Sequence, residues 1–341
     1  MATATEKPAA ATTPAPAPAP ADPTPLCTTC AHPAPHVYTT YTSKSNIRLG
    51  VCTHCGAFID PLIEAPALLL VLDLVLLKPR VFLHLLFNRG SPPLDASAGA
   101  PPGSAASSSS SAAQPPCPYL ARVRHDLAAL GVATLAADVG VRVLPLLQSP
   151  GSFNATLKAV ILTVVAAALE LLAQHAATLA LALAILYARG WYPARKGGSL
   201  SSRDGRQRSF VPELVPLVLL YTTLFPLLLQ LALSIWYAPP ASIHETLLPT
   251  AASASVLPER VVAALPAALA DSIKAAEDGV VAAWSGANRV WAGTRLLGGM
   301  SAGFGLRVLL PTRPWETTSI VIFGWVAALL AAQWLDPLLL G

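Results

Sequence analysis

Four cysteines near the N-terminus have the residue type and spacing of a metal site. Cys27 and Cys30 form one C-x2-C pair, Cys52 and Cys55 form a second, and 21 residues separate the pairs. Each pair, placed on a tight turn, presents two thiolates to one ion, and zinc prefers four such ligands in tetrahedral geometry. A closed all-thiolate shell leaves no open position for catalysis. We therefore predict a structural Zn²⁺ ion bound by these four residues.

Other uses of these residues stay open at this point. Two disulfides would explain four cysteines, but they need an oxidising compartment. A nearby histidine could replace one thiolate, and the candidates are His32, His36 and His54. Cys117 stands apart from the pairs, and it is either a free thiol or a palmitoylation site.

The composition indicates a membrane protein. Of 341 residues, 54% are hydrophobic and only 12% are charged, whereas soluble domains carry about 25% charged residues. The net charge of +4 is small and scattered, which argues against a nucleic-acid partner. We expect an all-α polytopic membrane protein with a small N-terminal four-cysteine zinc-ribbon-like unit.

Long apolar runs define the predicted membrane domain, residues 117–341. Four spans are expected, at 127–147, 157–187, 211–237 and 318–335. Pro226 should kink the third span. Residues 257–311 read as an amphipathic luminal segment that lies on the surface, and the glycines between Gly298 and Gly305 should interrupt it.

The N-terminal third divides into four segments. Residues 1–26 form an Ala/Pro-rich disordered tail without the apolar core of a signal peptide, and residues 27–65 form the zinc-ribbon-like domain. Residues 66–89 are expected to form two short helices at the membrane interface, with a buried hairpin as the alternative. Residues 90–116 are a low-complexity linker.

Loop charges predict the orientation. Residues 188–210 contain six Arg or Lys against one Asp, whereas residues 238–316 contain six basic and six acidic residues. The positive-inside rule places the first segment in the cytosol and the second in the lumen. Counting back through two spans places the zinc unit in the cytosol, where thiols stay reduced.

Ionisable residues inside the predicted spans are costly and mark candidate sites. Asp138 and Arg142 share one helix face, so they either pair towards the bundle or contact a lipid headgroup. Glu170 and Gln174, with His175 beside them, either line a polar seam for a lipid or bond across helices. The candidate lipid or partner contacts are Asp73, Lys78, His84, Asn88, Asp138, Arg142 and Glu170.

The stretch 27–89 resembles the ARV family, the "ACAT-related protein required for viability" proteins of the endoplasmic reticulum. The resemblance rests on the cysteines, on Ile47–Leu49, on Asp60–Glu64 and on Leu72–Asn88. This chain has Leu62 where the family usually has an aromatic residue, and Val81–Leu83 where the family has Ala-Tyr-Arg.

The resemblance implies a multi-pass protein of the endoplasmic-reticulum membrane that acts in lipid homeostasis, through sterol transport and sphingolipid balance. The alternative that it implies is a non-catalytic accessory subunit or scaffold for GPI-anchor biosynthesis. The partners would be membrane lipids (sterol, sphingolipid or GPI intermediates) or a GPI-biosynthetic enzyme. The sequence contains no recognisable catalytic set, and we expect no enzymatic activity.

Overall fold

The computed structural model describes residues 24–41, 47–95, 118–148, 153–192, 204–236 and 289–340. Several predicted features therefore lie outside the described residues. These are nearly all of the tail 1–26, Cys117, most of the linker 90–116 and residues 257–288 of the amphipathic segment.

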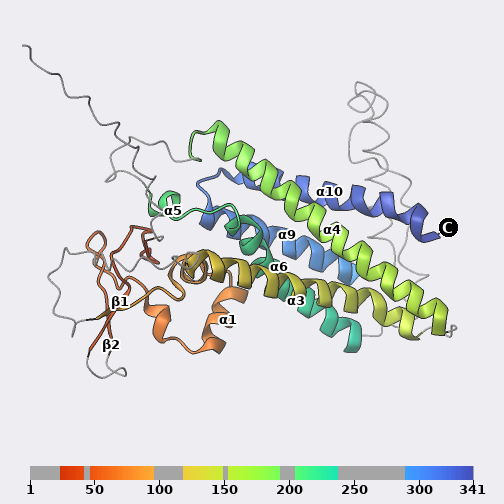
Figure 1. The fold of residues 1–341 in the computed structure, drawn as a ribbon, viewed down its shortest axis with the longest axis horizontal. Coiled ribbons are helices and arrows are strands. Elements are labelled where there is room, and N and C mark those ends of the chain that lie inside the picture. The colour runs from red at the N-terminus through yellow and green to blue at the C-terminus, as the bar shows by residue number, and fades with distance from the viewer. Residues whose placement is uncertain are drawn as a thin grey trace, which may run out of the picture.

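Five long helices form one bundle, and a small unit that contains the four cysteines lies at one end of it (Figure 1). The helices are α3 (Pro118–Gln148), α4 (Phe153–Ala188), α6 (Leu214–Trp236), α9 (Arg289–Leu309) and α10 (Pro314–Leu340). Four of them, α3, α4, α6 and α10, are long and apolar enough to cross a membrane. Three of them contain a predicted span, and α6 coincides with the third predicted span, 211–237, except for a few residues at its ends. The predicted fold class, a mostly helical multi-pass membrane protein, is confirmed.

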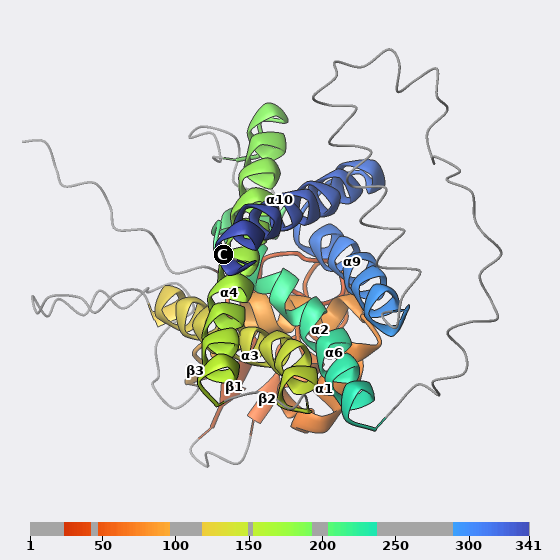
Figure 2. The same ribbon diagram turned by 90° about the vertical axis from the view of Figure 1, so that its right-hand side faces the viewer.

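The bundle buries the N-terminal half of α6 and leaves apolar surface on the outer helices. The most extensive contacts join α4 to α10, α6 to α9, and α3 to α6, and Figure 2 shows these pairs in a view along the bundle. On α4, large side chains such as Ile161, Val165 and Leu172 point outward. Hydrocarbon tails are as apolar as leucine, so a bilayer covers such side chains without cost.

The cysteine unit, residues 24–41 and 47–65, has little regular structure. Strands β1 (Tyr38–Thr40) and β2 (Ile47–Leu49) pair antiparallel, and β3 (Leu94–Asp95) pairs parallel with β1. The small core of the unit consists of Cys27, Ala34, Val37, Cys52 and Ile59. A core of this size supports a fold only with an additional cross-link, such as a metal ion.

The two short helices predicted at the membrane interface have different surroundings. Helix α1 (Ala67–Val75) is exposed, with Leu68 at 72% and Leu72 at 52% of full exposure. The second segment, α2 (Pro79–Leu83) followed by one π-helical turn, η2 (His84–Asn88), is buried in the main core.

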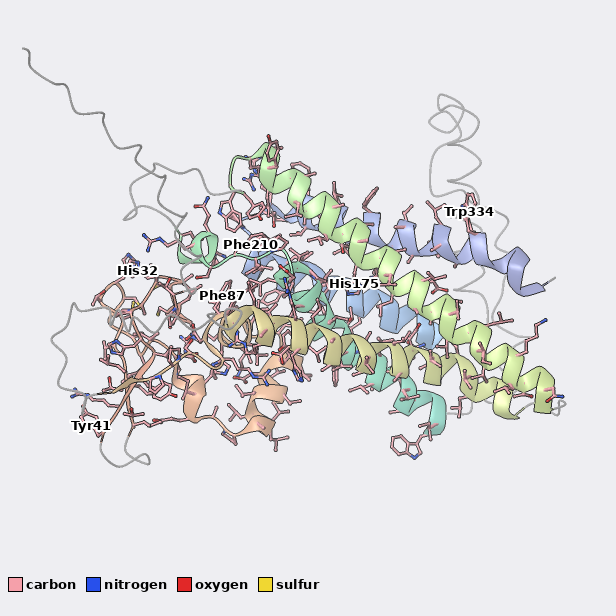
Figure 3. The ribbon with its side chains drawn as sticks, viewed as in Figure 1. His32, Tyr41, Phe87, His175, Phe210 and Trp334 are labelled. Atoms are coloured by element: carbon pink, nitrogen blue, oxygen red, sulfur yellow. The ribbon has the colours of Figure 1, made fainter. Side chains whose placement is uncertain are left out.

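The physical reason is that α2 and η2 are apolar on several faces and pack against the bundle. Phe82 lies against Phe304 of α9, with ring centroids 6.3 Å apart. Phe87 lies where the cysteine unit meets the bundle (Figure 3). Residues 80–88 are therefore largely buried against the bundle, which matches neither an exposed interfacial helix nor a hairpin packed on the cysteine unit alone.

Helix α9 differs from the expectation for residues 257–311. The glycines of this stretch do not interrupt the helix, which is continuous from Arg289 to Leu309. A Cβ atom at Gly299 would collide with the indole of Trp325 on α10, and one at Gly305 would lie 2.8 Å from Cγ2 of Thr222 on α6. The glycines therefore permit close helix packing, as small residues do in membrane bundles.

Because α9 runs the length of α6, its C-terminal end returns to the cysteine unit (Figure 1). There Nη1 of Arg206, in the short helix α5 (Gly205–Arg208), donates to the carbonyl of Val308 at 3.0 Å. Nη1 of Arg189 donates to the carbonyl of Pro311 at 2.6 Å. The residues at the C-terminal end of α9 thus lie at the same end of the bundle as Arg189 and Arg206 of the basic segment. The sequence predicts the opposite, luminal side for residues 257–311.

Candidate metal centre and intramembrane polar site

The four cysteines meet at one point of the cysteine unit. Their sulfur atoms all lie within 4.8 Å of one another. The Sγ atoms of Cys27 and Cys55 are 3.7 Å apart, as are those of Cys30 and Cys52, and all four thiols are free. Zinc–sulfur bonds of about 2.3 Å in a tetrahedron require sulfur–sulfur distances of about 3.8 Å. The residues present therefore fit one zinc ion.

Two similar turns hold the thiols. In the first, the N–H of Ala31 donates to the carbonyl of Cys27 at 2.8 Å, and in the second, the N–H of Gly56 donates to the carbonyl of Cys52 at 2.9 Å. Both turns end in the left-handed region, with φ of 56° at Ala31 and 70° at Gly56. Glycine adopts this conformation freely, whereas alanine does so at a cost.

The turns also set the acidity of the thiols. Burial raises the pKa of Cys27, and burial raises the pKa of Cys30 to about 12. Burial acts in the same direction on Cys52, but backbone N–H groups of Cys55 and His54 donate to its sulfur and lower its pKa to about 7. One thiolate is therefore available near neutral pH to start metal binding.

The nearby histidines are arranged differently from ligands. The rings of His32 and His54 stack with centroids 5.0 Å apart. Among the described residues, the group able to hold a metal consists of the four cysteines. The ring of His32 lies at the outer end of the cysteine unit in Figure 3.

A buried polar network joins the cysteine unit to η2. Oδ2 of Asp60 accepts hydrogen bonds from Nδ1 of His84 at 2.7 Å and from Nδ2 of Asn88 at 2.8 Å. Asn88 also exchanges two hydrogen bonds with the backbone of Leu26, the residue before the first cysteine. His84 and Asn88, predicted as lipid or partner contacts, are thus buried among protein groups.

Asp60 was not among the predicted site residues. Its Oδ1 atom accepts from the N–H of Leu62 at 3.0 Å and caps the 3₁₀ turn η1 (Pro61–Glu64). The signal in the sequence was an acidic residue directly before Pro61, which is typical of a helix start. That signal predicts the cap but does not reveal the contacts with η2.

Asp73 and Lys78 form an ion pair between Oδ1 and Nζ at 2.5 Å. Asp73 is largely buried, whereas the side chain of Lys78 is 53% exposed. An ion pair with one exposed partner contributes less than about 1 kcal/mol. The lipid or partner contact of these two residues stays a prediction.

The predicted ionisable residues of the spans meet across two helices. On α3, Nη2 of Arg142 lies 2.9 Å from Oδ2 of Asp138. The same guanidinium reaches α4, where Nη1 donates to Oε1 of Glu170 at 2.9 Å and Nη2 to Oε2 at 2.5 Å. The structure therefore shows the bundle-facing pair for Asp138 and Arg142, and it adds Glu170 as a third member.

Both carboxylates also line a cavity of about 60 Å³ inside the bundle. Thr134 of α3, His175 of α4, Gln230 of α6 and Trp325 of α10 contribute further walls. His175 lies between the long helices, midway along the bundle (Figure 3). The polar seam expected around Glu170 therefore borders a cavity that residues of five helices line.

Comparisons with known proteins agree with the resemblance of the N-terminal third. The sequence model of a family described as the Arv1-like family matches residues 26–257. "Protein arv1" of Schizosaccharomyces pombe is 43% identical over 63 residues, and "Protein ARV1" of Saccharomyces cerevisiae is 40% identical over 63 residues. These segments cover 18% of this chain and 24% and 19% of the two relatives. No solved structure matches.

Proposed function

The chain belongs to the Arv1-like family, and on that premise we propose that it takes part in sterol transport and sphingolipid balance in the endoplasmic-reticulum membrane. Family membership supports a role in lipid homeostasis in general. The finer role draws support from one observation, a cavity lined by five helices in which polar side chains such as Glu170 and His175 stand among apolar ones.

In this proposal the cysteine unit is a non-catalytic platform in the cytosol. A structural Zn²⁺ ion bound by Cys27, Cys30, Cys52 and Cys55 would hold the two turns together, and a closed shell supplies no catalytic position. The Asp60 network would transmit that rigidity to η2 and the bundle. The exposed leucines of α1, together with the exposed side chains of Lys78 and Arg80 at the start of α2, would lie among lipid headgroups.

A second candidate role is an accessory subunit of GPI-anchor biosynthesis. The observation that favours it is the same exposed apolar face of α1, because contiguous exposed apolar residues also mark protein interfaces. In that role the leucines would contact a membrane-bound biosynthetic enzyme instead of lipid.

The test is purification of the full chain from endoplasmic-reticulum membranes in mild detergent, with copurifying proteins and lipids quantified together. An enriched sterol or sphingolipid without a stoichiometric protein partner is the expected result. A stoichiometric GPI-biosynthetic enzyme, lost in a variant with Leu68→Ser and Leu72→Ser, would overturn the transport role and establish the second one. The matched control is Leu169→Ser with Leu172→Ser on the outer face of α4.

A further inference from the structure

The cavity contains polar atoms that have no protein partner. Nε2 of His175 and Oγ1 of Thr134 are buried and make no hydrogen bond to any residue that the structure describes. Both residues line the cavity. Buried polar atoms without partners are rare in native structures, and each indicates a missing hydrogen-bonding group, such as a water or a ligand.

The two unpartnered atoms determine whether the missing group must donate or accept hydrogen bonds. Nδ1 of His175 lies 2.9 Å from the carbonyl oxygen of Leu171, which can only accept, so Nδ1 carries the proton. In the neutral ring Nε2 is then an acceptor and requires an O–H or N–H donor. The hydroxyl of Thr134 can both donate and accept. A hydroxyl group can satisfy either atom, because it both donates and accepts.

The charge of the cavity wall excludes phosphate-bearing groups. Asp138 and Glu170 line the cavity, whereas Arg142, which pairs with both and balances only one of their two negative charges, is not part of its wall. An anionic headgroup would face two carboxylates at a depth where charge is poorly screened. The wall therefore favours an uncharged hydrogen-bond donor.

Size and depth identify the molecule that carries the donor. A water needs about 10–15 Å³ of such a cavity, so about 60 Å³ accommodates a hydroxyl and the atoms next to it but no large headgroup. Leu135, Leu227 and Trp325 supply apolar wall for those atoms. The lining residues lie near the middle of the candidate spans, where membrane lipids are the abundant molecules.

We propose that this cavity binds the hydroxyl group of an uncharged membrane lipid, of the sterol, ceramide or diacylglycerol class, which donates to Nε2 of His175. The inference rests on the proposed lipid role and specifies its site. His175 selects the lipid by requiring a free O–H, and the carboxylates reject phosphorylated lipids.

The first test uses the unmodified full chain in lipid nanodiscs. A photoreactive cholesterol analogue with a free 3-hydroxyl should crosslink to peptides of α3 and α4, and its 3-O-methyl ether, which lacks the donor, should bind at least about tenfold more weakly. Unlabelled cholesterol, ceramide or diacylglycerol should compete, and the most effective competitor identifies the lipid class. Phosphatidylserine should not compete. Equal binding of the ether, or crosslinks confined to the outer helix faces, would show that the cavity holds only water.

The second test uses a matched pair of variants. His175→Phe keeps a ring of similar shape but removes the acceptor, and it should abolish the discrimination between the alcohol and the ether. His125→Phe makes the same exchange on the exposed surface of α3, where the histidine side chain is 82% exposed, and it should change nothing. Retained discrimination in His175→Phe would overturn the assignment of the acceptor.

Failure of this inference is distinguishable from failure of the proposed function. If the sterol distribution in cells depends on the chain but no alcohol-specific crosslink forms, the proposed function stands and the proposed site is refuted. If an alcohol-specific crosslink forms but removal of the chain leaves sterol and sphingolipid levels unchanged, the proposed site stands and the proposed function is refuted.

Discussion

Nδ1 of His84 lies 2.7 Å from Oδ2 of Asp60, and the two side chains are 8% and 0% exposed. This contact joins η2 to the residue that caps η1 in the cysteine unit. Asn88 binds the same carboxylate oxygen and also the backbone beside Cys27. The cysteine cluster and the helix bundle are therefore parts of one packed structure, and damage to this network should reach both.

Asp60→Ala should destabilise the protein strongly. The change leaves His84, Asn88 and the N–H of Leu62 without their acceptor, and unsatisfied buried groups cost about 1–3 kcal/mol each. We expect a clear fall in thermal unfolding temperature, measured in one detergent at fixed zinc. Arg124→Met, which removes only the exposed ion pair with Glu213, should cost less than about 1 kcal/mol. Equal effects of the two changes would contradict a structural role for the network.

Cys52→Ser should reduce bound zinc from one ion per chain to near zero, because three thiolates and a hydroxyl make a much poorer zinc site. The measurement is metal content of the purified protein by mass spectrometry. Cys117→Ser is the matched control, because it alters the fifth cysteine of the chain and should leave zinc unchanged. Full zinc content in Cys52→Ser would mean that a histidine completes the site.

Zinc affinity should rise with pH, and more steeply below pH 7 than above it. Metal binding displaces the protons of Cys27 and Cys30 throughout the neutral range, because burial raises the pKa of both thiols. Below the pKa of Cys52, about 7, a further proton must leave. A plot of the logarithm of affinity against pH, measured by chelator competition between pH 6 and 8, should therefore change slope by about one near pH 7. A constant slope would contradict the lowered pKa of Cys52.

Gly305→Ala should destabilise the bundle, whereas Gly303→Ala should not. A Cβ atom at Gly305 would lie 2.8 Å from Thr222 and 3.1 Å from Val218, which would force α9 away from α6. At Gly303 nothing lies within 4 Å, and alanine there should gain up to about 1 kcal/mol of helix propensity. Thermal unfolding of the two variants in the same detergent measures the difference. If both variants gain stability, the stability of the bundle does not depend on the close packing of α9 on α6.

The C-terminus should lie on the opposite side of the membrane from the cysteine unit. Helix α9 has 21 residues, about 31 Å of helix, which matches the hydrocarbon thickness of about 30 Å. With α9 as a fifth crossing, the end of α10 lies at the far end of the bundle from the cysteines (Figure 1). The loop charges agree, since residues 237–288 contain two basic and five acidic residues.

Glycosylation acceptor tags test this topology in endoplasmic-reticulum membranes. A tag after Gly341 should be modified, and a tag within residues 193–203 should not. A modified loop tag would place the basic segment in the lumen. Two unmodified tags would restore the four-span topology, in which the C-terminus is cytosolic.

The sequence by itself determined the features that depend on neighbouring residues. Two C-x2-C pairs predict a four-thiolate site because each pair needs only one turn to bring its two thiols together. The four spans follow from apolar runs of sufficient length. The family resemblance likewise rests on contiguous segments between Cys27 and Asn88.

Only the tertiary structure decided which distant residues meet. The partner of His84 is 24 residues away in a different element, and no local pattern distinguishes its buried ring from an exposed one. The glycine-rich sequence of α9 is typical of a helix break. Its glycines are contact points only because Trp325 and Thr222 lie opposite Gly299 and Gly305. Arg142 had one expected partner, Asp138, and the fold supplied Glu170 as a second. The physical reason is that local propensity depends on adjacent residues, whereas burial, helix contact and cavity formation depend on the whole packed chain.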